Sequence, residues 1–425
     1  MNYSVSPVTY PQSLRALRSR NYRLFFAGQG ISLLGNWMTL TTSAWLIYEL
    51  SNDPFLVGFL PFANQIPVLL LAPFGGILGD RLPRQRLMWW LNAFCGLQAA
   101  ALAILTLTDQ ITVTRLLLLV TIRGVINAAE FPTRQSFIVD LVDRKEDLPN
   151  AIALNSSLFN AARLVGPGIA GILIATVGPG ACYLLDATSY AAILTSLLAM
   201  RTRPRRRPKK ASHPIADLKA GIRYASTHRS LRPSLLMVPM IAMAGFASST
   251  LAPIFARDVY GGNSTTLGMM FSAVGAGALV SAVLLAKRPS PQGLSKWVAI
   301  GAFSIAIGQF GFAFSPSLTI ALICLTATGF GTVLAMAGNN TLVQSHVADD
   351  KRSRVMGLFA MGQGMFPIGS LTAGAIAAQF GPRPAVATAA VATALAGLYF
   401  IRSSHEFPRV RPPKRPAPLP SDSQT

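Results

Sequence analysis

Residues 54–86, PFLVGFLPFANQIPVLLLAPFGGILGDRLPRQR, decide the fold class, because an apolar run without a single charge ends abruptly in a basic loop. The run from Pro54 to Gly79 is long enough to cross a hydrocarbon core about 30 Å thick, which takes roughly 20 apolar residues in a helix. Similar runs, separated by short polar or basic segments, recur along the 425 residues. The pattern predicts an all-α polytopic membrane protein.

The composition agrees with this prediction and argues against several classes of soluble protein. Apolar residues make up 51% of the chain, as in ordinary domains, but charged residues only 12%, about half the usual share. The net charge of +21 lies mostly in short segments between the apolar runs. A soluble enzyme, a disordered chain and a basic nucleic-acid-binding domain are therefore poor fits. Because the three cysteines and four histidines are scattered, we expect no disulfide framework, no metal site and no cofactor.

Twelve apolar segments are predicted to be transmembrane helices, arranged as two six-helix bundles. Their boundaries are 24–48, 55–79, 87–108, 112–133, 152–176, 181–200, 233–256, 264–286, 296–314, 317–338, 355–380 and 384–402. With an even number of spans both termini lie on one side, and 32 of the 37 Lys and Arg residues fall on that side. Because basic residues are retained in the cytoplasm during insertion, both termini are predicted to be cytoplasmic.

A basic linker divides the chain into two halves. The predicted parts are a cytoplasmic N-terminal segment (1–23), an N-terminal bundle (24–200), a linker with an amphipathic helix (201–232), a C-terminal bundle (233–402) and a disordered cytoplasmic tail (403–425). The linker is either a solvated loop that fixes topology or a segment that binds anionic lipid or a partner. AGILIATVGP (170–179) resembles AGAIAAQFGP (373–382), as in transporters built from two homologous bundles.

The loop after the second span carries a specific motif. GGILGDRLPRQR (75–86) resembles the cytoplasmic signature of the major facilitator superfamily, although Pro83 stands where glycine is usual. Longer stretches, such as PTRQ (132–135) and NAARLVGP (160–167), resemble the branch that contains the bacterial enterobactin (siderophore) exporters and drug effluxers. The resemblance covers nearly the whole chain and implies a multi-pass protein of the bacterial plasma (inner) membrane. The alternative for the motif is a plain basic loop with an incidental aspartate.

By this resemblance, two groups of residues would control the conformational change. A cytoplasmic gate, closed by ion pairs in the outward-open state, would contain Gly76, Asp80, Arg81, Arg84, Arg134 and Asp140. In span five, GPGIAG (166–171) resembles the antiporter signature, and Gly166, Pro167 and Gly171 would make a thin, bendable helix face. Close packing without any antiport meaning is the alternative for this second motif.

Ionisable residues inside the apolar spans are few and therefore mark candidate sites. Spans seven to twelve contain no internal acid, so a proton-coupling carboxylate must come from the first half. Glu130 is the first candidate and Asp186 the second. Alternatively, Glu130 only neutralises Arg123, Arg134 or Arg163. Residues that would line the cavity or pair with these charges are Arg123, Arg163, Asn36, Gln65 and Asn340.

These observations favour a secondary active transporter that exports a small amphipathic molecule, such as a siderophore or a drug-like compound, by proton-coupled alternating access. The export direction follows from the resemblance alone. The alternatives are a polytopic membrane enzyme, a channel or receptor, and a uniporter or importer of another solute. The chain has no Gly-Lys pair for a phosphate-binding loop, so it is not expected to hydrolyse ATP. The expected partners are the small-molecule substrate, protons and membrane lipids but no nucleic acid, and we expect a monomer.

Overall fold

The computed structural model describes residues 11–201, 223, 231–288, 293–347 and 351–404. Within these residues every regular element is a helix. The predicted linker helix and the predicted disordered tail lie almost entirely outside the described residues. A short 3-10 helix, Gln12–Arg18, precedes the first long helix.

Six long helices form the N-terminal half. They are α1 (Arg20–Ser51), α2 (Pro54–Arg81), α3 (Arg84–Leu107), α4 (Val113–Leu141), α5 (Leu148–Thr176) and α6 (Pro179–Ala199). Local signals explain their starts, since Asp53 caps the amide of Phe55 and Thr112 caps the amide of Arg115. α1 packs on α5 and α6, α2 on α4, and α3 on α4 and α6.

The C-terminal half contains more and shorter elements. They are α8 (Leu231–Ala244), α9 (Ala247–Thr250), α10 (Ala252–Ile254), a π-helical turn (Phe255–Val259), α11 (Ser264–Ala286), α12 (Leu294–Ala313), α13 (Leu318–His346), α14 (Arg352–Gln363), α15 (Phe366–Phe380) and α16 (Pro382–Ser404). α12 packs on α13 and α16, and α11 packs on α13.

Two predicted spans are not single helices. Span 233–256 is broken after Ala244, where Gln309 donates a hydrogen bond of 3.1 Å to the freed carbonyl oxygen. Span 355–380 is interrupted between α14 and α15, just before Pro367, which cannot donate a helical hydrogen bond. The prediction also ended α4 and α13 about eight residues too early, because polar residues follow the apolar core of each helix.

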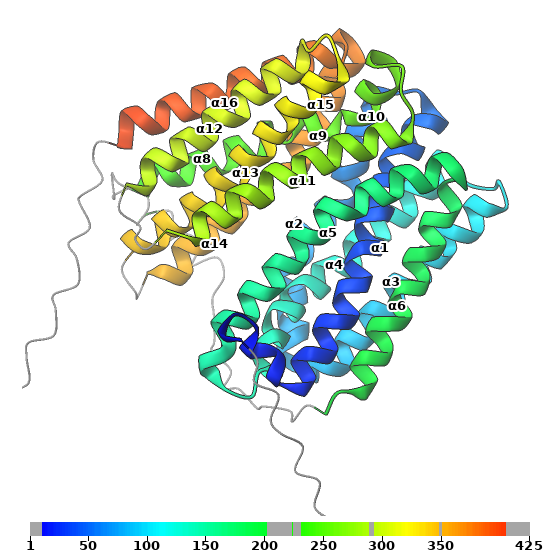
Figure 1. The fold of residues 1–425 in the computed structure, drawn as a ribbon, viewed down its shortest axis with the longest axis vertical. Helices are drawn as coiled ribbons and strands as arrows, with labels where there is room; N and C mark the ends of the chain where they lie inside the picture. The colour runs from blue at the N-terminus through cyan, green and yellow to red at the C-terminus, as the bar shows by residue number, and fades with distance from the viewer. Residues whose placement is uncertain (1–10, 202–222, 224–230, 289–292, 348–350, 405–425) are drawn as a thin grey trace, which may run out of the picture.

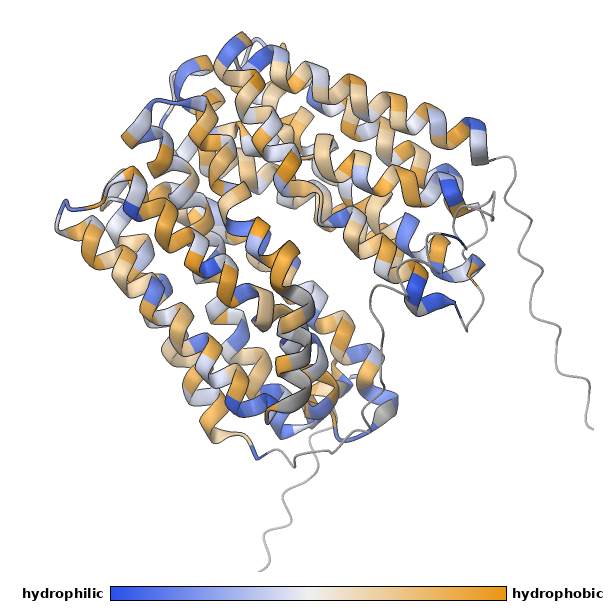
Figure 2. Ribbon diagram, turned by 180° about the vertical axis from the view of Figure 1, so that it is seen from behind, coloured by the Kyte–Doolittle hydropathy of each residue, from blue (hydrophilic) through white to orange (hydrophobic). Residues whose placement is uncertain are grey.

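Ten helical segments of the described chain are long and apolar enough to cross a membrane. α1 is not among them although it has 32 residues, because it carries polar side chains that the fold buries, such as Gln29, Thr39 and Thr42. α14 and α15 are each too short on their own. The arrangement of twelve spans therefore remains a prediction. Figure 2 shows hydrophobic residues along the helix lengths and hydrophilic residues gathered toward the helix ends.

The two halves form two bundles that meet at one end and diverge toward the other (Figure 1). α5 packs on α11, and α2 packs on α15. Two of their close approaches are Gly171 with Gly268 and Gly58 with Gly374, and both lie toward the same end of the molecule. We call this the closed end of the molecule. The opposite end, which carries Arg15, Arg84 and Asp140, is called the basic end.

Candidate functional site

At the basic end, two predicted gate residues form an ion pair. Arg84, in the first turn of α3, places its Nη1 atom 2.7 Å from Oδ2 of Asp140 near the end of α4. Arg84 also donates a hydrogen bond of 3.2 Å to the carbonyl oxygen of Ser136. Both side chains are largely buried, at 13% and 16% exposure. This pair joins α3 to α4 and lies within the N-terminal half.

Arg134, the additional partner expected for this cluster, is paired elsewhere. Its Nε atom lies 3.5 Å from Oε1 of Glu130, one helical turn away on α4, and its guanidinium lies over the Phe131 ring. Glu130 is therefore neutralised by Arg134, one of the three arginines considered for that role. The side chains of Asp80 and Arg81 and the surroundings of Gly76 lie outside the described part of the structure, so the part of these residues in the gate stays a prediction.

Asp186 occupies the centre of a polar layer between α1 and α6. It is fully buried, and its Oδ2 atom accepts a hydrogen bond of 2.8 Å from Thr39. Ser189 lies 3.5 Å from the other carboxylate oxygen. Gly35 lets α1 approach this layer, since an added Cβ there would lie 2.6 Å from Asp186 Oδ1. The carboxylate is thus held between two helices of one half.

Arg123 connects this layer to α4. Its Nη2 atom donates a hydrogen bond of 2.9 Å to Oδ1 of Asn36, and its guanidinium lies over the Tyr190 ring at 5.4 Å. The charges of Arg123 and Asp186 are close enough to interact, although the two do not form a direct ion pair. Arg123 thus belongs to the Asp186 layer, whereas Glu130, two turns further along α4, pairs with Arg134 instead.

The predicted helix-bending motif lies inside one continuous helix, α5, and packs closely on both neighbours. A Cβ added at Gly166 would lie 2.7 Å from Cβ of Trp37 in α1, and one added at Gly171 would lie 2.6 Å from the carbonyl oxygen of Ser264, the first residue of α11. Pro167 is buried within the same helix. The motif is therefore closely packed on α1 of its own half at Gly166 and on α11 of the other half at Gly171. Whether the motif bends during transport stays a prediction.

At the closed end, a polar contact links the two halves. The Tyr48 hydroxyl, at the end of α1, donates a hydrogen bond to Oδ2 of Asp258 in the π-helical turn. Arg257 lies over the Tyr48 ring at 5.5 Å and 3.9 Å from Oδ1 of Asp258. We call these three residues the latch. Trp45, Glu49, Tyr48 and Arg257 line a small cavity of about 230 Å³ beside it.

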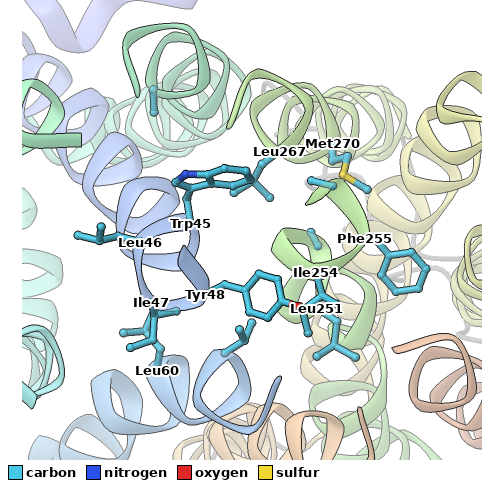
Figure 3. Close-up of a cluster of buried hydrophobic side chains, with 14 of the residues drawn as sticks. Trp45, Leu46, Ile47, Tyr48, Leu60, Leu251, Ile254, Phe255, Leu267 and Met270 are labelled. Carbon is cyan, nitrogen blue, oxygen red and sulfur yellow. The ribbon is translucent and has the colours of Figure 1, made fainter. Parts of the chain in front are cut away.

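Buried hydrophobic side chains surround the latch. Figure 3 shows Trp45 and Tyr48 of α1 directed toward the segment that contains Leu251 and Ile254 and toward Leu267 and Met270 of α11. These residues belong to one buried cluster shared by both halves. Sequence reasoning missed the latch, because Tyr48 and Asp258 are 210 positions apart and neither belongs to a recognisable motif.

The remaining predicted cavity residues are distributed over both halves. Gln65 is half-buried on α2, and Asn340 on α13 accepts a hydrogen bond from Gln344 within its own helix. Arg163, in the middle of α5, lies over the Trp37 ring at 5.9 Å. The structure therefore gathers Asn36, Arg123 and Asp186 into one layer. Arg163 of α5 lies outside this layer and contacts α1 through Trp37.

Comparisons with known proteins agree with this architecture. Residues 12–411 match the family model described as transmembrane secretion effector. The chain is 27% identical to the staphyloferrin A transporter of Staphylococcus aureus, over 84% of this chain and 90% of that protein. It is 25% identical to the enterobactin exporter EntS of Citrobacter koseri, over 94% of each, and 23% identical to the multidrug efflux pump Tap of Mycolicibacterium fortuitum, over 81% and 86%.

The fold is also similar to solved transporter structures. A bacterial homologue of the lysosomal transporter Spinster, in an inward-facing and unoccupied conformation, superposes with a TM-score of 0.69. The match covers 93% of this chain and 98% of that one, at 14% identity. At this identity the likeness concerns the fold alone. The predicted resemblance to the siderophore and drug efflux branch is confirmed by the sequence relatives.

Proposed function

Because the chain belongs to the transmembrane secretion effector family of major facilitator transporters, it is a membrane transporter and not an enzyme, and we propose that it exports a small amphipathic molecule by proton-coupled alternating access. The alternative of a polytopic membrane enzyme is excluded by the family. What we propose is the direction of transport, its coupling to protons and the class of the transported molecule.

One observation carries the proposal: the two bundles are joined by glycine contacts, a latch and a shared hydrophobic cluster at one end, and they diverge toward the other (Figure 1). Two rigid halves joined at one end are suited to rocking about a binding site between them. We assign the basic end to the cytoplasm, because the basic residues concentrate in the loops on that side. The closed end would then face outward, and the conformation would be inward-facing.

For the proton-binding carboxylate, the structure offers two different environments. Glu130 is already paired with Arg134 on its own helix, whereas Asp186 accepts hydrogen bonds from neutral groups and interacts with Arg123 without a direct ion pair. Burial favours the protonated form of a carboxylate, whereas a direct ion pair favours the charged form. We therefore propose Asp186 as the coupling residue, with Glu130 as the alternative.

The substrate is proposed to be a siderophore, because two relatives carry siderophore names and align over most of their length. A drug-like compound is the alternative, by similarity to the multidrug pump. The test is flux in proteoliposomes with an imposed pH gradient, using enterobactin, staphyloferrin A and the cationic dye ethidium as separate substrates. Transport that stops when a protonophore collapses the gradient supports proton coupling.

The coupling residue is tested with Asp186→Asn and Glu130→Gln in the same assay. We expect Asp186→Asn to abolish the dependence on the gradient while leaving exchange of substrate across the membrane measurable. Glu130→Gln should retain the dependence. The reverse result would assign coupling to Glu130, and absence of flux for all compounds in the wild-type protein would contradict the proposed function.

A further inference from the structure

Arg163 differs from the other charged residues in the middle of the described helices. Arg134 pairs with Glu130, and Arg123 donates a hydrogen bond to Asn36. Among the residues that the structure describes, Arg163 is half-buried and forms no ion pair and no side-chain hydrogen bond. Since a cation at this depth is costly, it marks a candidate binding site.

The only described contact of this guanidinium is aromatic. It lies over the Trp37 ring at 5.9 Å, within the range of a cation–π interaction. Phe159, one turn earlier on α5, packs edge-on against the same ring at 5.6 Å. The close approach at Gly166 fixes the distance between the two helices. Trp37 and Arg163 therefore present a flat apolar surface next to a positive charge.

This pair lies beside the contact between the two halves. Trp37 precedes Tyr48 by three helical turns on nearly the same face of α1, which places it about 16 Å from the latch along the helix axis. On α5, the carbonyl oxygen of Leu164, the residue after Arg163, accepts a hydrogen bond of 2.9 Å from Ser272 of α11. Arg163 is also close to the middle of a 29-residue helix. Substrate sites of such transporters are expected at this depth and between the halves.

We propose that Arg163 and Trp37 form an anion-binding subsite for the transported molecule. Arg163 binds a carboxylate, or another deprotonated acid group, through its planar fork of N–H donors. Trp37 stacks on an aromatic or flat apolar part of the same molecule. The subsite rests on the proposed transport function and narrows its substrate class to amphipathic anions, rather than the cations that a general drug pump would take.

The test compares salicylate with methyl salicylate, which share the ring and differ by one negative charge. Binding to the full-length protein in nanodiscs is measured by ligand-observed NMR. We expect Arg163→Gln to weaken salicylate binding about tenfold, as for the loss of a charge-assisted hydrogen bond, and to leave methyl salicylate unaffected. Arg163→Lys should restore part of the loss. Trp37→Phe should weaken both compounds by a similar factor.

Arg115→Gln is the matched control, because it removes the same charge from an exposed position at the start of α4. It should leave the preference for salicylate unchanged. Equal binding of acid and ester by the wild-type protein, absence of binding, or an unchanged preference in Arg163→Gln would overturn the subsite. The binding measurements do not depend on the flux assay. If the protein transports enterobactin but does not prefer salicylate to methyl salicylate, the subsite is rejected and the proposed transport function stands.

Discussion

The basic end and the closed end of the molecule are held together by different chemistry. The ion pairs Arg84–Asp140 and Arg15–Asp147 at the basic end connect elements of the N-terminal half, and Glu130–Arg134 lies within α4 of the same half. Toward the closed end the two halves touch through glycines and hydrophobic side chains, and the polar contacts between them include the latch and hydrogen bonds from Ser264 and Ser272 of α11 to carbonyl oxygens of α5. Charge thus stabilises one half internally, whereas small and apolar residues join the halves.

The difference suits the rocking of the two halves that we propose for transport. A buried ion pair is costly to break, because each partner loses its counter-charge. Small residues allow close backbone approach and gain van der Waals contact, and this contact can be lost and regained without leaving a charge unpaired. We infer that the closed end is the reversible contact and that the Arg84–Asp140 pair keeps α3 and α4 together as the N-terminal half moves.

The largest effect is expected from filling the contact between the halves. A Cβ at Gly58 would lie 2.4 Å from the carbonyl oxygen of Ser370 and 2.6 Å from Cα of Gly374. Overpacking costs about 1–3 kcal/mol, so Gly58→Leu should reduce the population of the closed end about 5- to 150-fold. We expect transport to be lost and the distance between spin labels at Val177→Cys and Phe380→Cys to increase, in a protein otherwise free of cysteine.

Gly357→Leu on α14 is the matched control for this variant. A Cβ added at Gly357 meets nothing within 4 Å, so the same substitution adds no clash there. It should leave both the label distance and the flux close to wild type. Wild-type flux in Gly58→Leu would show that the contact between α2 and α15 does not have to close.

The sequence predicted much of the fold but little of the contact between the halves. Apolar runs and basic loops located every long helix of the described chain, since hydrophobic length is a local property. Arg84 and Asp140 were expected in one ion cluster, because the family resemblance places both residues in the gate, and they form an ion pair. The contacts Gly58–Gly374 and Tyr48–Asp258 were not, because they depend on how two helices far apart in the chain cross. Likewise, no local pattern distinguished the Thr39 that holds Asp186 from other helical threonines.

An intermediate effect is expected at the basic end. Arg84→Ala removes a pair at 2.7 Å that is largely but not fully buried, so the loss should fall between that of a surface pair and that of a buried pair, at about 2 kcal/mol. The free energy of unfolding, measured by chemical denaturation in detergent, should fall by this amount. The double variant Arg84→Ala/Asp140→Ala should lose less than the sum of the single variants.

Arg15→Ala provides the comparison at the same end. Arg15 lies 3.3 Å from Asp147 but is 39% exposed, so water screens the pair and the loss should stay below about 1 kcal/mol. If Arg84→Ala lowered the free energy of unfolding as little as Arg15→Ala, the Arg84–Asp140 pair would not stabilise the N-terminal half. A loss of flux at unchanged stability would instead support the gate role implied by the family motif.

The smallest effect is expected from the latch, where only one hydroxyl is removed. Tyr48→Phe keeps the ring under Arg257 and deletes the hydrogen bond to Asp258, which contributes about 1 kcal/mol and shifts the balance between closed and separated halves about fivefold. The same spin labels should report more of the longer distance. Tyr183→Phe is the control, because it removes a hydroxyl that bonds to Ser43 at 3.0 Å within the N-terminal half. That variant should lower the free energy of unfolding without moving the label distance. Equal distance shifts in the two variants would mean that loosening of the N-terminal half, rather than the latch, separates the closed end.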